Sequence, residues 1–347
     1  MRSTFYFGAC SPKGFVSHAG SLLDELQALT IIKGGSGCGK STFMRAIGRA
    51  AEEKGLDVQY ILCSSDPDSL DGVLLPALSL GYVDGTAPHI LEPRLCGGSM
   101  NYLNFGAFYD SAAMRPNEEE ILAAQRENKA CYVPVTACLA AADRLLDCVR
   151  QETAQPHCLE EVEAIGECLA LSALKPHGEN PIIRRRFLSC VTPKGLMLCG
   201  QTPGALCPRV YVLRDNYGLA PIALALLEKR AAALGHEIYA CHSPLQPDGA
   251  PAHLLIPTAQ TAFVSESTDF PYDGPCFCRI DLDSTLPPRV RKELSFCTDT
   301  VSSLLFEAVR HMRMAKRHHD RIEQLCRPFV DFTAVQALTE KTIAALL

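Results

Sequence analysis

The sequence predicts an α/β protein built from two tandem three-layer units, each carrying an appended helical hairpin. Three observations lead to this fold class. A glycine-rich loop stands between an apolar segment and an amphipathic one, the first half of the chain recurs in the second half, and each copy ends in two long segments with helical spacing. We therefore divide the 347 residues into units at 1–180 and 181–347.

The glycine-rich loop is the most specific motif of the chain. It is the segment Gly34-Gly35-Ser36-Gly37-Cys38-Gly39-Lys40-Ser41-Thr42, which matches the phosphate-binding pattern G-x-x-x-x-G-K-[ST]. Small residues let backbone N–H groups approach a triphosphate, while Lys40 reaches the outer phosphates and the Ser41 hydroxyl ligates Mg²⁺. Residues 28–32 are predicted to form a buried strand, and 41–54 a helix whose positive end faces the anion. The units are therefore predicted to be P-loop NTPase-like, with ATP and Mg²⁺ bound at this loop.

A further ligand for Mg²⁺ is expected at the end of a second strand. Residues 78–84 form a mostly apolar segment that ends in Asp84, and a carboxylate in that place holds the metal through water. The equivalent residue of the second copy is Ser265, so the carboxylate and the loop are lost together. The alternative is an ordinary aspartate at a strand end. Gly85 stands where many P-loop ATPases carry a catalytic glutamate, so a catalytic base must come from elsewhere.

Two places in the first unit could supply that base. His89 follows the turn after Asp84, although it could equally be a surface histidine. An acidic cluster, Asp66, Asp68 and Asp71, follows the predicted strand 58–62, and α/β sheets bind ligands at the carboxyl ends of their strands. One of these carboxylates could deprotonate a water or an acceptor hydroxyl, the alternative being that Asp66 or Asp68 caps a turn. The predicted catalytic residues are Lys40, Asp84, Asp68 and His89.

The internal repeat is supported by five matches in the same order. They are Phe7–Gly14 with Leu188–Gly195, Lys54–Val58 with Leu234–Ile238, Pro67-Asp68 with Pro247-Asp248, Leu74–Pro76 with Leu255–Pro257, and Tyr82-Val83 with Phe263-Val264. In the second copy Leu219 and Ala220 replace Lys40 and Ser41, and Asp215 would repel a triphosphate. We expect one active half and one degenerate half. Arg214 of the degenerate half is either a surface residue or an arginine finger that approaches the γ-phosphate.

Each copy is predicted to end in a helical hairpin. Helical spacing extends over 117–150 and 159–174 in the first copy, and over 288–325 and 333–347 in the second. The boundary between the units falls near 176–186, where proline, glycine and asparagine are found. The run Arg184-Arg185-Arg186 in this stretch is predicted to be a solvated linker rather than a binding site.

Composition limits the partners and the compartment. The net charge of −6 gives no sign of a general nucleic-acid binder. We expect a cytoplasmic protein, because the chain shows no secretory signal, and we expect its 17 cysteines to be reduced thiols. We expect no membrane contact, because the sequence lacks a run of about eighteen apolar residues. Cys38 is predicted to be a small residue that fits the loop, the alternative being an acidic, oxidisable thiol. A protein partner or a homo-oligomer stays open.

Four segments of the chain resemble a bacterial family of uncharacterised, duplicated P-loop ATPases. They are residues 11–14, 33–42, 63–72 and 84–89, and the similarity runs over nearly the whole chain. The resemblance implies ATP binding and hydrolysis. Members of that family often keep a working loop in both halves, and this chain departs from them in its second half.

These observations predict an ATP hydrolase with a single site in the first half. One alternative is a P-loop kinase-type phosphotransferase that uses Asp66 or Asp68 as the base for an acceptor. Another is a nucleotide-gated interaction protein with negligible turnover. The absence of an Asn-Lys-x-Asp motif favours adenine over guanine.

Overall fold

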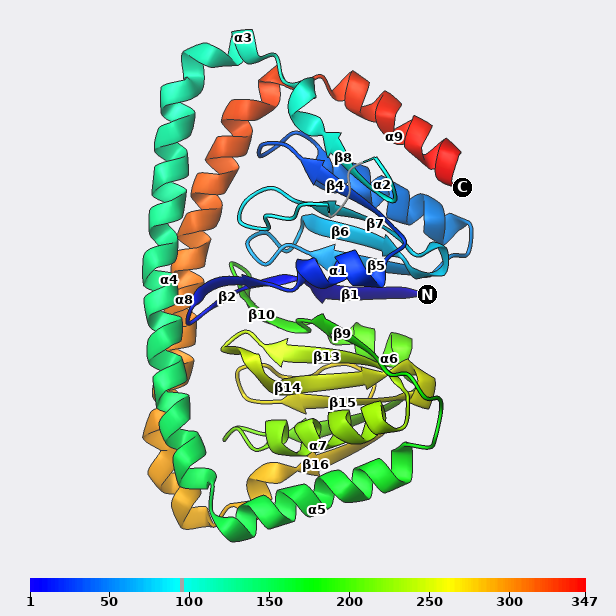
Figure 1. Cartoon of the computed structure of the whole chain (residues 1–347). Coiled ribbons are helices and arrows are strands. Elements are labelled where there is room, and N and C mark those ends of the chain that lie inside the picture. Colours follow the sequence, from blue (N-terminus) through cyan, green and yellow to red (C-terminus); the bar gives the residue numbers. More distant parts are fainter. Residues whose placement is uncertain (94–96) are drawn as a thin grey trace.

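The computed structural model describes residues 1–93 and 97–347 and shows an α/β protein with two mixed six-stranded sheets (Figure 1). The first sheet has the order β1-β5-β6-β7-β4-β8, formed in that order by Arg2–Tyr6, Val58–Leu62, Leu70–Leu75, Leu80–Asp84, Ala28–Lys33 and Met100–Asn104. The second has the order β9-β13-β14-β15-β12-β16, formed by Ile182–Arg186, Glu237–Ser243, Gln246–Ile256, Thr261–Glu266, Arg209–Arg214 and Cys278–Asp281. Each half adds a short hairpin, made by Gly8–Ser11 and Gly14–Ser17 (β2, β3) and by Ser189–Thr192 and Gly195–Leu198 (β10, β11).

The two sheets have the same topology, as a tandem duplication requires. β9 takes the place of β1, β12 that of β4, and the antiparallel pairs β5–β6 and β13–β14 correspond. The likeness extends to single backbone angles. Ser79 and Gln260 occupy equivalent turns and are both non-glycine residues in the left-handed region, with φ of 48° and 53°. The prediction of a duplicated α/β unit is therefore confirmed.

The strand, loop and helix around the glycine-rich segment form as predicted. β4 buries Leu29, Ile31 and Ile32, and the helix α2 (Lys40–Glu53) starts directly after the loop. α2 faces the sheet with an apolar stripe at helical spacing and stops before Gly55, whose φ of +76° ends the helix. In the second half, α7 (Ala220–Ala233) occupies the same position after β12.

Long helices close each half, but they do not pair as the predicted hairpins. α4 (Glu118–Thr153) and α8 (Pro288–Cys326) pack against each other along one side of both sheets (Figure 1). α5 (Pro156–Ala173), which ends the first half, packs on α7 of the second half. α9 (Phe332–Leu346), which ends the second half, packs on α2 of the first. Helical spacing in the sequence located these helices. It could not identify the helices that they pack on, because packing depends on which apolar faces of the other half are uncovered.

The two halves meet around an approximate two-fold axis. Tyr6 and Phe187, which are equivalent residues, exchange both backbone hydrogen bonds at 2.9 Å. Beside them the ring of Phe5 stacks on Tyr239, with 5.4 Å between the ring centroids. One apolar core cluster contains residues of both sheets, so the halves share a core.

The arginine run is part of this junction and not a solvated linker. All three arginines lie in β9, and Arg186 is only 1% exposed. Its guanidinium donates to both carboxylate oxygens of Glu25, at 3.0 and 2.6 Å. Burial raises the pKa of Glu25, but Arg186, Ser21 and Arg184 together lower it by more, so the net shift is downward. The interpretation as a linker was wrong because the charge is neutralised by a partner 161 residues away.

Within residues 1–93 and 97–347, no helix combines the length and the apolar character that crossing a bilayer requires.

The buried ion pair gives a prediction about stability. Glu25→Gln leaves the buried Arg186 guanidinium without its counter-charge, so we expect the free energy of unfolding in urea to fall by about 3–5 kcal/mol. Glu293→Gln breaks the exposed pair with Arg289 and should leave the unfolding curve unchanged. Equal unfolding curves for the two variants would contradict the conclusion that Glu25 neutralises a buried charge.

Candidate functional site

The loop between β4 and α2 has the backbone shape that its glycines allow. Gly39 has a φ of +94°, a left-handed conformation that side chains rarely adopt. Gly34 is needed for a different reason. A Cβ atom there would lie 2.8 Å from Cβ of Phe105, so only glycine fits. The loop therefore presents bare backbone at the start of α2.

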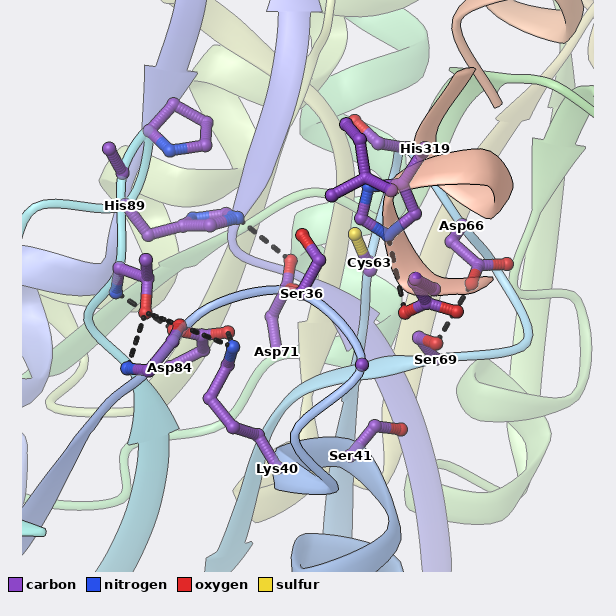
Figure 2. Close-up of a pocket in the computed structure, with 18 of the residues that line it drawn as sticks. Ser36, Lys40, Ser41, Cys63, Asp66, Ser69, Asp71, Asp84, His89 and His319 are labelled. Carbon is purple, nitrogen blue, oxygen red and sulfur yellow. Dashed lines mark hydrogen bonds and ion pairs between the residues drawn. The ribbon is translucent and has the colours of Figure 1, made fainter. Parts of the chain in front are cut away.

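A pocket of about 830 Å³ brings the predicted site residues together at the carboxyl ends of the strands (Figure 2). Its wall includes Gly34, Ser36, Gly37, Cys38, Gly39, Lys40, Ser41 and Thr42 of the loop, together with Asp66, Asp68, Asp71, Asp84 and His89. Gly35 contributes to the same place through its carbonyl, which accepts a hydrogen bond from Lys40. A volume of this size is typical of small-molecule sites.

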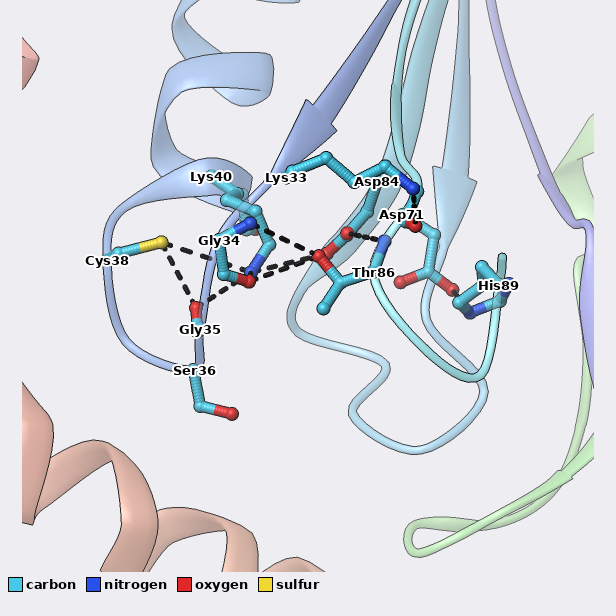
Figure 3. Close-up of polar contacts among 12 residues, drawn as sticks. Lys33, Gly34, Gly35, Ser36, Cys38, Lys40, Asp71, Asp84, Thr86 and His89 are labelled. Carbon is cyan, nitrogen blue, oxygen red and sulfur yellow. Dashed lines mark hydrogen bonds and ion pairs between the residues drawn. The ribbon is translucent and has the colours of Figure 1, made fainter. Parts of the chain in front are cut away.

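Lys40 and Asp84 lie side by side at the loop (Figure 3). Nζ of Lys40 donates to the carbonyls of Gly34 and Gly35, at 2.7 and 2.8 Å, and lies 3.5 Å from Oδ2 of Asp84. Asp84 accepts a 2.8 Å hydrogen bond from the N–H of Thr86, whose hydroxyl donates to the Gly34 carbonyl at 3.1 Å. Sequence reasoning missed Thr86, although a hydroxyl two positions after the strand-end aspartate was a usable signal.

The three aspartates of the acidic cluster lie in different environments. Oδ2 of Asp66 accepts from the Ser69 hydroxyl at 2.9 Å and lies 3.5 Å from Nζ of Lys316 in α8. Asp68 is exposed and pairs with Lys194 of the second half at 2.5 Å. Asp71 is buried and faces His89.

The pair of Asp68 and Lys194 is repeated in the other half. There Lys13 pairs with Asp248 at 2.7 Å, so each hairpin reaches the acidic loop of the opposite sheet. The hairpin lysines belong to the repeated Pro-Lys-Gly motif, which the sequence analysis used only as evidence of duplication.

His89 is not a surface histidine. It is 7% exposed, its Nε2 lies 2.9 Å from Oδ2 of Asp71, and its ring meets Phe15 edge-on at 4.7 Å between centroids. Burial lowers the pKa of His89, but Asp71 and, less strongly, Asp84 raise it by more, so the net shift is upward. The pair forms a positioned imidazole and carboxylate on the pocket wall beside the loop.

Cys38 does not have the character of an acidic thiol. Its Sγ donates to the Gly35 carbonyl at 3.1 Å, and burial raises its pKa against the opposing influence of Lys40. The alternative of an oxidisable thiolate in the loop is therefore not supported.

The second half also contributes to the wall of the pocket. His319 and Glu323 come from α8, Arg327 follows α8 directly, and Phe332 is the first residue of α9. Glu323 lies directly against the loop, because a Cβ on Gly37 would be 3.3 Å from its Cα. Sequence reasoning missed these residues, since helical spacing does not reveal which distant loop a helix covers.

Arg214, the proposed arginine finger, lies elsewhere. It lines a second pocket of about 420 Å³ in the degenerate half, where its Nε is 4.0 Å from Oδ2 of Asp283. The arginine-finger alternative is not supported, because the first loop is covered by α8 and α9 instead, whereas Arg214 is exposed, as the surface-residue alternative predicts.

The degenerate loop contains its own anion. Asp215, equivalent to Gly34, is buried and accepts backbone N–H groups from Tyr217, Leu219 and Ala220 at 3.0, 2.9 and 2.7 Å. Burial raises its pKa, partly offset by these three hydrogen bonds. The N–H groups of the second loop therefore bind a carboxylate of the chain itself, while Gly34 supplies no such group to the first loop.

Three comparisons with known proteins were negative. No protein-family model, no curated protein and no solved structure matches the chain. The resemblance to duplicated P-loop ATPases therefore rests on the sequence segments alone.

Asp215 provides a test of the loop as an anion cradle. Asp215→Ala leaves three buried N–H groups without an acceptor, so we expect the free energy of unfolding to fall by about 1–3 kcal/mol or more. Added phosphate should restore part of the lost melting temperature by occupying the vacated position. Asp248→Ala, which removes an exposed carboxylate, should show neither effect. Equal stabilisation of both variants by phosphate would indicate only a general salt effect.

Proposed function

We propose that this protein is a Mg²⁺-dependent nucleoside triphosphatase with its single site in the first half, and that ATP is the substrate. The observation that carries the proposal is the open phosphate-binding loop beside Lys40 and Asp84, in contrast to the carboxylate that fills the sister loop. The backbone amides of Gly34–Thr42 would hold the phosphates.

Each residue of the site has a role in this proposal. Lys40, released from the loop carbonyls, neutralises charge on the outer phosphates. Ser41 and Asp84 are the oxygen ligands for Mg²⁺, which would supply charge stabilisation when bound. Thr86 holds Asp84 in place through its backbone N–H.

His89 is the best candidate for orienting and deprotonating the attacking water. The contact with Asp71 holds Nε2 of the imidazole in place, and the neutral imidazole can accept a proton. Asp68 is less suited to this role, because it is exposed and already paired with Lys194.

Replacing the loop lysine tests the proposal. Lys40→Ala removes the cation that stabilises developing phosphate charge, so we expect the rate of phosphate release from ATP to fall by about 10²–10³-fold. Lys54→Ala, at the other end of α2, is the matched control and should keep the wild-type rate. Equal, negligible turnover in wild type and Lys40→Ala, with tight ATP binding by wild type, would instead favour the nucleotide-gated interaction protein.

The pH dependence tests the role of His89. Because the pKa of His89 lies above its usual 6.5, kcat/KM should fall as the pH drops through that raised value and the ring becomes charged. Asp71→Asn removes the main cause of the increase, so the acidic limb of the profile should move to lower pH. His89→Gln should lose the limb. If the acidic limb of the Asp71→Asn profile stayed at the wild-type pH, the limb would report the titration of a group other than His89.

A phosphotransferase is the second candidate, and one observation favours it. The pocket wall also carries polar side chains of α4, namely Gln125, Asn128, Lys129 and Tyr132, which would suit a small polar acceptor. Analysis of products separates the two functions. Release of inorganic phosphate from ATP with no added acceptor would exclude the kinase, whereas transfer to an added hydroxyl compound without that release would exclude the hydrolase.

A further inference from the structure

An exposed aromatic ring lies beside the phosphate-binding loop. Phe332, the first residue of α9, lines the pocket and is 39% exposed, and its ring lies 3.8 Å from the place that a Cβ on Gly39 would take. Phe15 and Tyr132 also line the pocket, but each has a partner. Phe15 packs on His89, and Tyr132 donates to the Ser65 hydroxyl at 3.0 Å.

A guanidinium lies next to this ring. Cζ of Arg327 is 5.5 Å from the centroid of Phe332, and the side chain has no carboxylate partner in the part of the chain that the structure describes. An aromatic face flanked by an arginine is a common platform for a nucleobase, because both groups stack on flat π systems.

This platform lies on the side of the loop away from the proposed metal ligand. β4, which leads into the loop, has β7 and Asp84 on one side and β8 on the other. The turn after β8, Phe105–Phe108, contacts α9. A triphosphate whose outer phosphates lie at Lys40 and Asp84 would therefore extend its nucleoside towards α9.

We propose that Phe332 and Arg327 form the base-binding part of the nucleotide site, with the purine ring stacked on Phe332. This inference rests on the proposed function, because it assumes that the loop holds the phosphates. The loop belongs to the first half and the platform to the second, so a bound nucleotide would connect them. The base would then hold the start of α9 against the loop.

A comparison of ATP with inorganic tripolyphosphate, both with Mg²⁺, tests the inference. Binding is measured by calorimetry on the full-length protein. Phe332→Ala removes the stacking surface, so we expect the Kd for ATP to rise on the order of ten-fold while the Kd for tripolyphosphate stays unchanged. Phe306→Ala, an exposed phenylalanine of α8, is the control and should change neither constant.

Phe332→Trp adds an optical readout. The chain has no tryptophan, so this variant carries a single reporter at the proposed platform. ATP should quench its fluorescence by stacking and should bind with near wild-type affinity, while tripolyphosphate should bind without quenching.

The outcomes separate the two proposals. An equal loss of both ligands in Phe332→Ala would show a general structural role for the ring and overturn the base site, as would unchanged ATP binding. If wild type binds neither ligand, the proposed function itself fails. If wild type binds tripolyphosphate as tightly as ATP, the result would support phosphate binding at the loop and overturn the base site.

Discussion

The packing of α4 against α8 is the contact on which the rest of this structure depends. The two helices run along both sheets, and their shared core with the hairpins includes Cys10 and Val191, which are equivalent residues of the two halves. Beyond this contact, α5 packs on α7 of the second half and α9 packs on α2 of the first half. The contact also places the end of α8 over the glycine-rich loop. The proposed site is therefore made of a loop from one half and a cover from the other.

One position largely explains the difference between the two loops. Gly34 carries no side chain, whereas the equivalent Asp215 supplies a carboxylate that is held by three N–H groups of its own loop. In the second half, the negative charge of Asp215 therefore faces the positive N-terminal end of α7. The backbone of the second loop is therefore held by a side chain of the loop itself.

The sequence predicted the features that depend on local pattern. The glycine-rich motif located the loop, and the repeat with its apolar strands led to the duplicated α/β fold, which the two sheets confirm. It also suggested that Asp84 and His89 would lie near the loop, as they do. What it could not predict were contacts between distant segments. Arg186 looked like part of a solvated run because its partner Glu25 is far away in the chain. The exchange of α5 and α9 depends on complementary apolar faces, which helical spacing cannot assign to a partner.

The exchange of helices also affects how the molecule could come apart. The Tyr6–Phe187 pair on the approximate two-fold axis, together with equivalent strands on either side, is the arrangement that joining the two subunits of a symmetric dimer would leave. In such a molecule the connecting segment between α5 and β9 does not hold the halves together. A cut in that segment would yield two fragments that remain interlocked, because each would still supply a helix that packs on a helix of the other half.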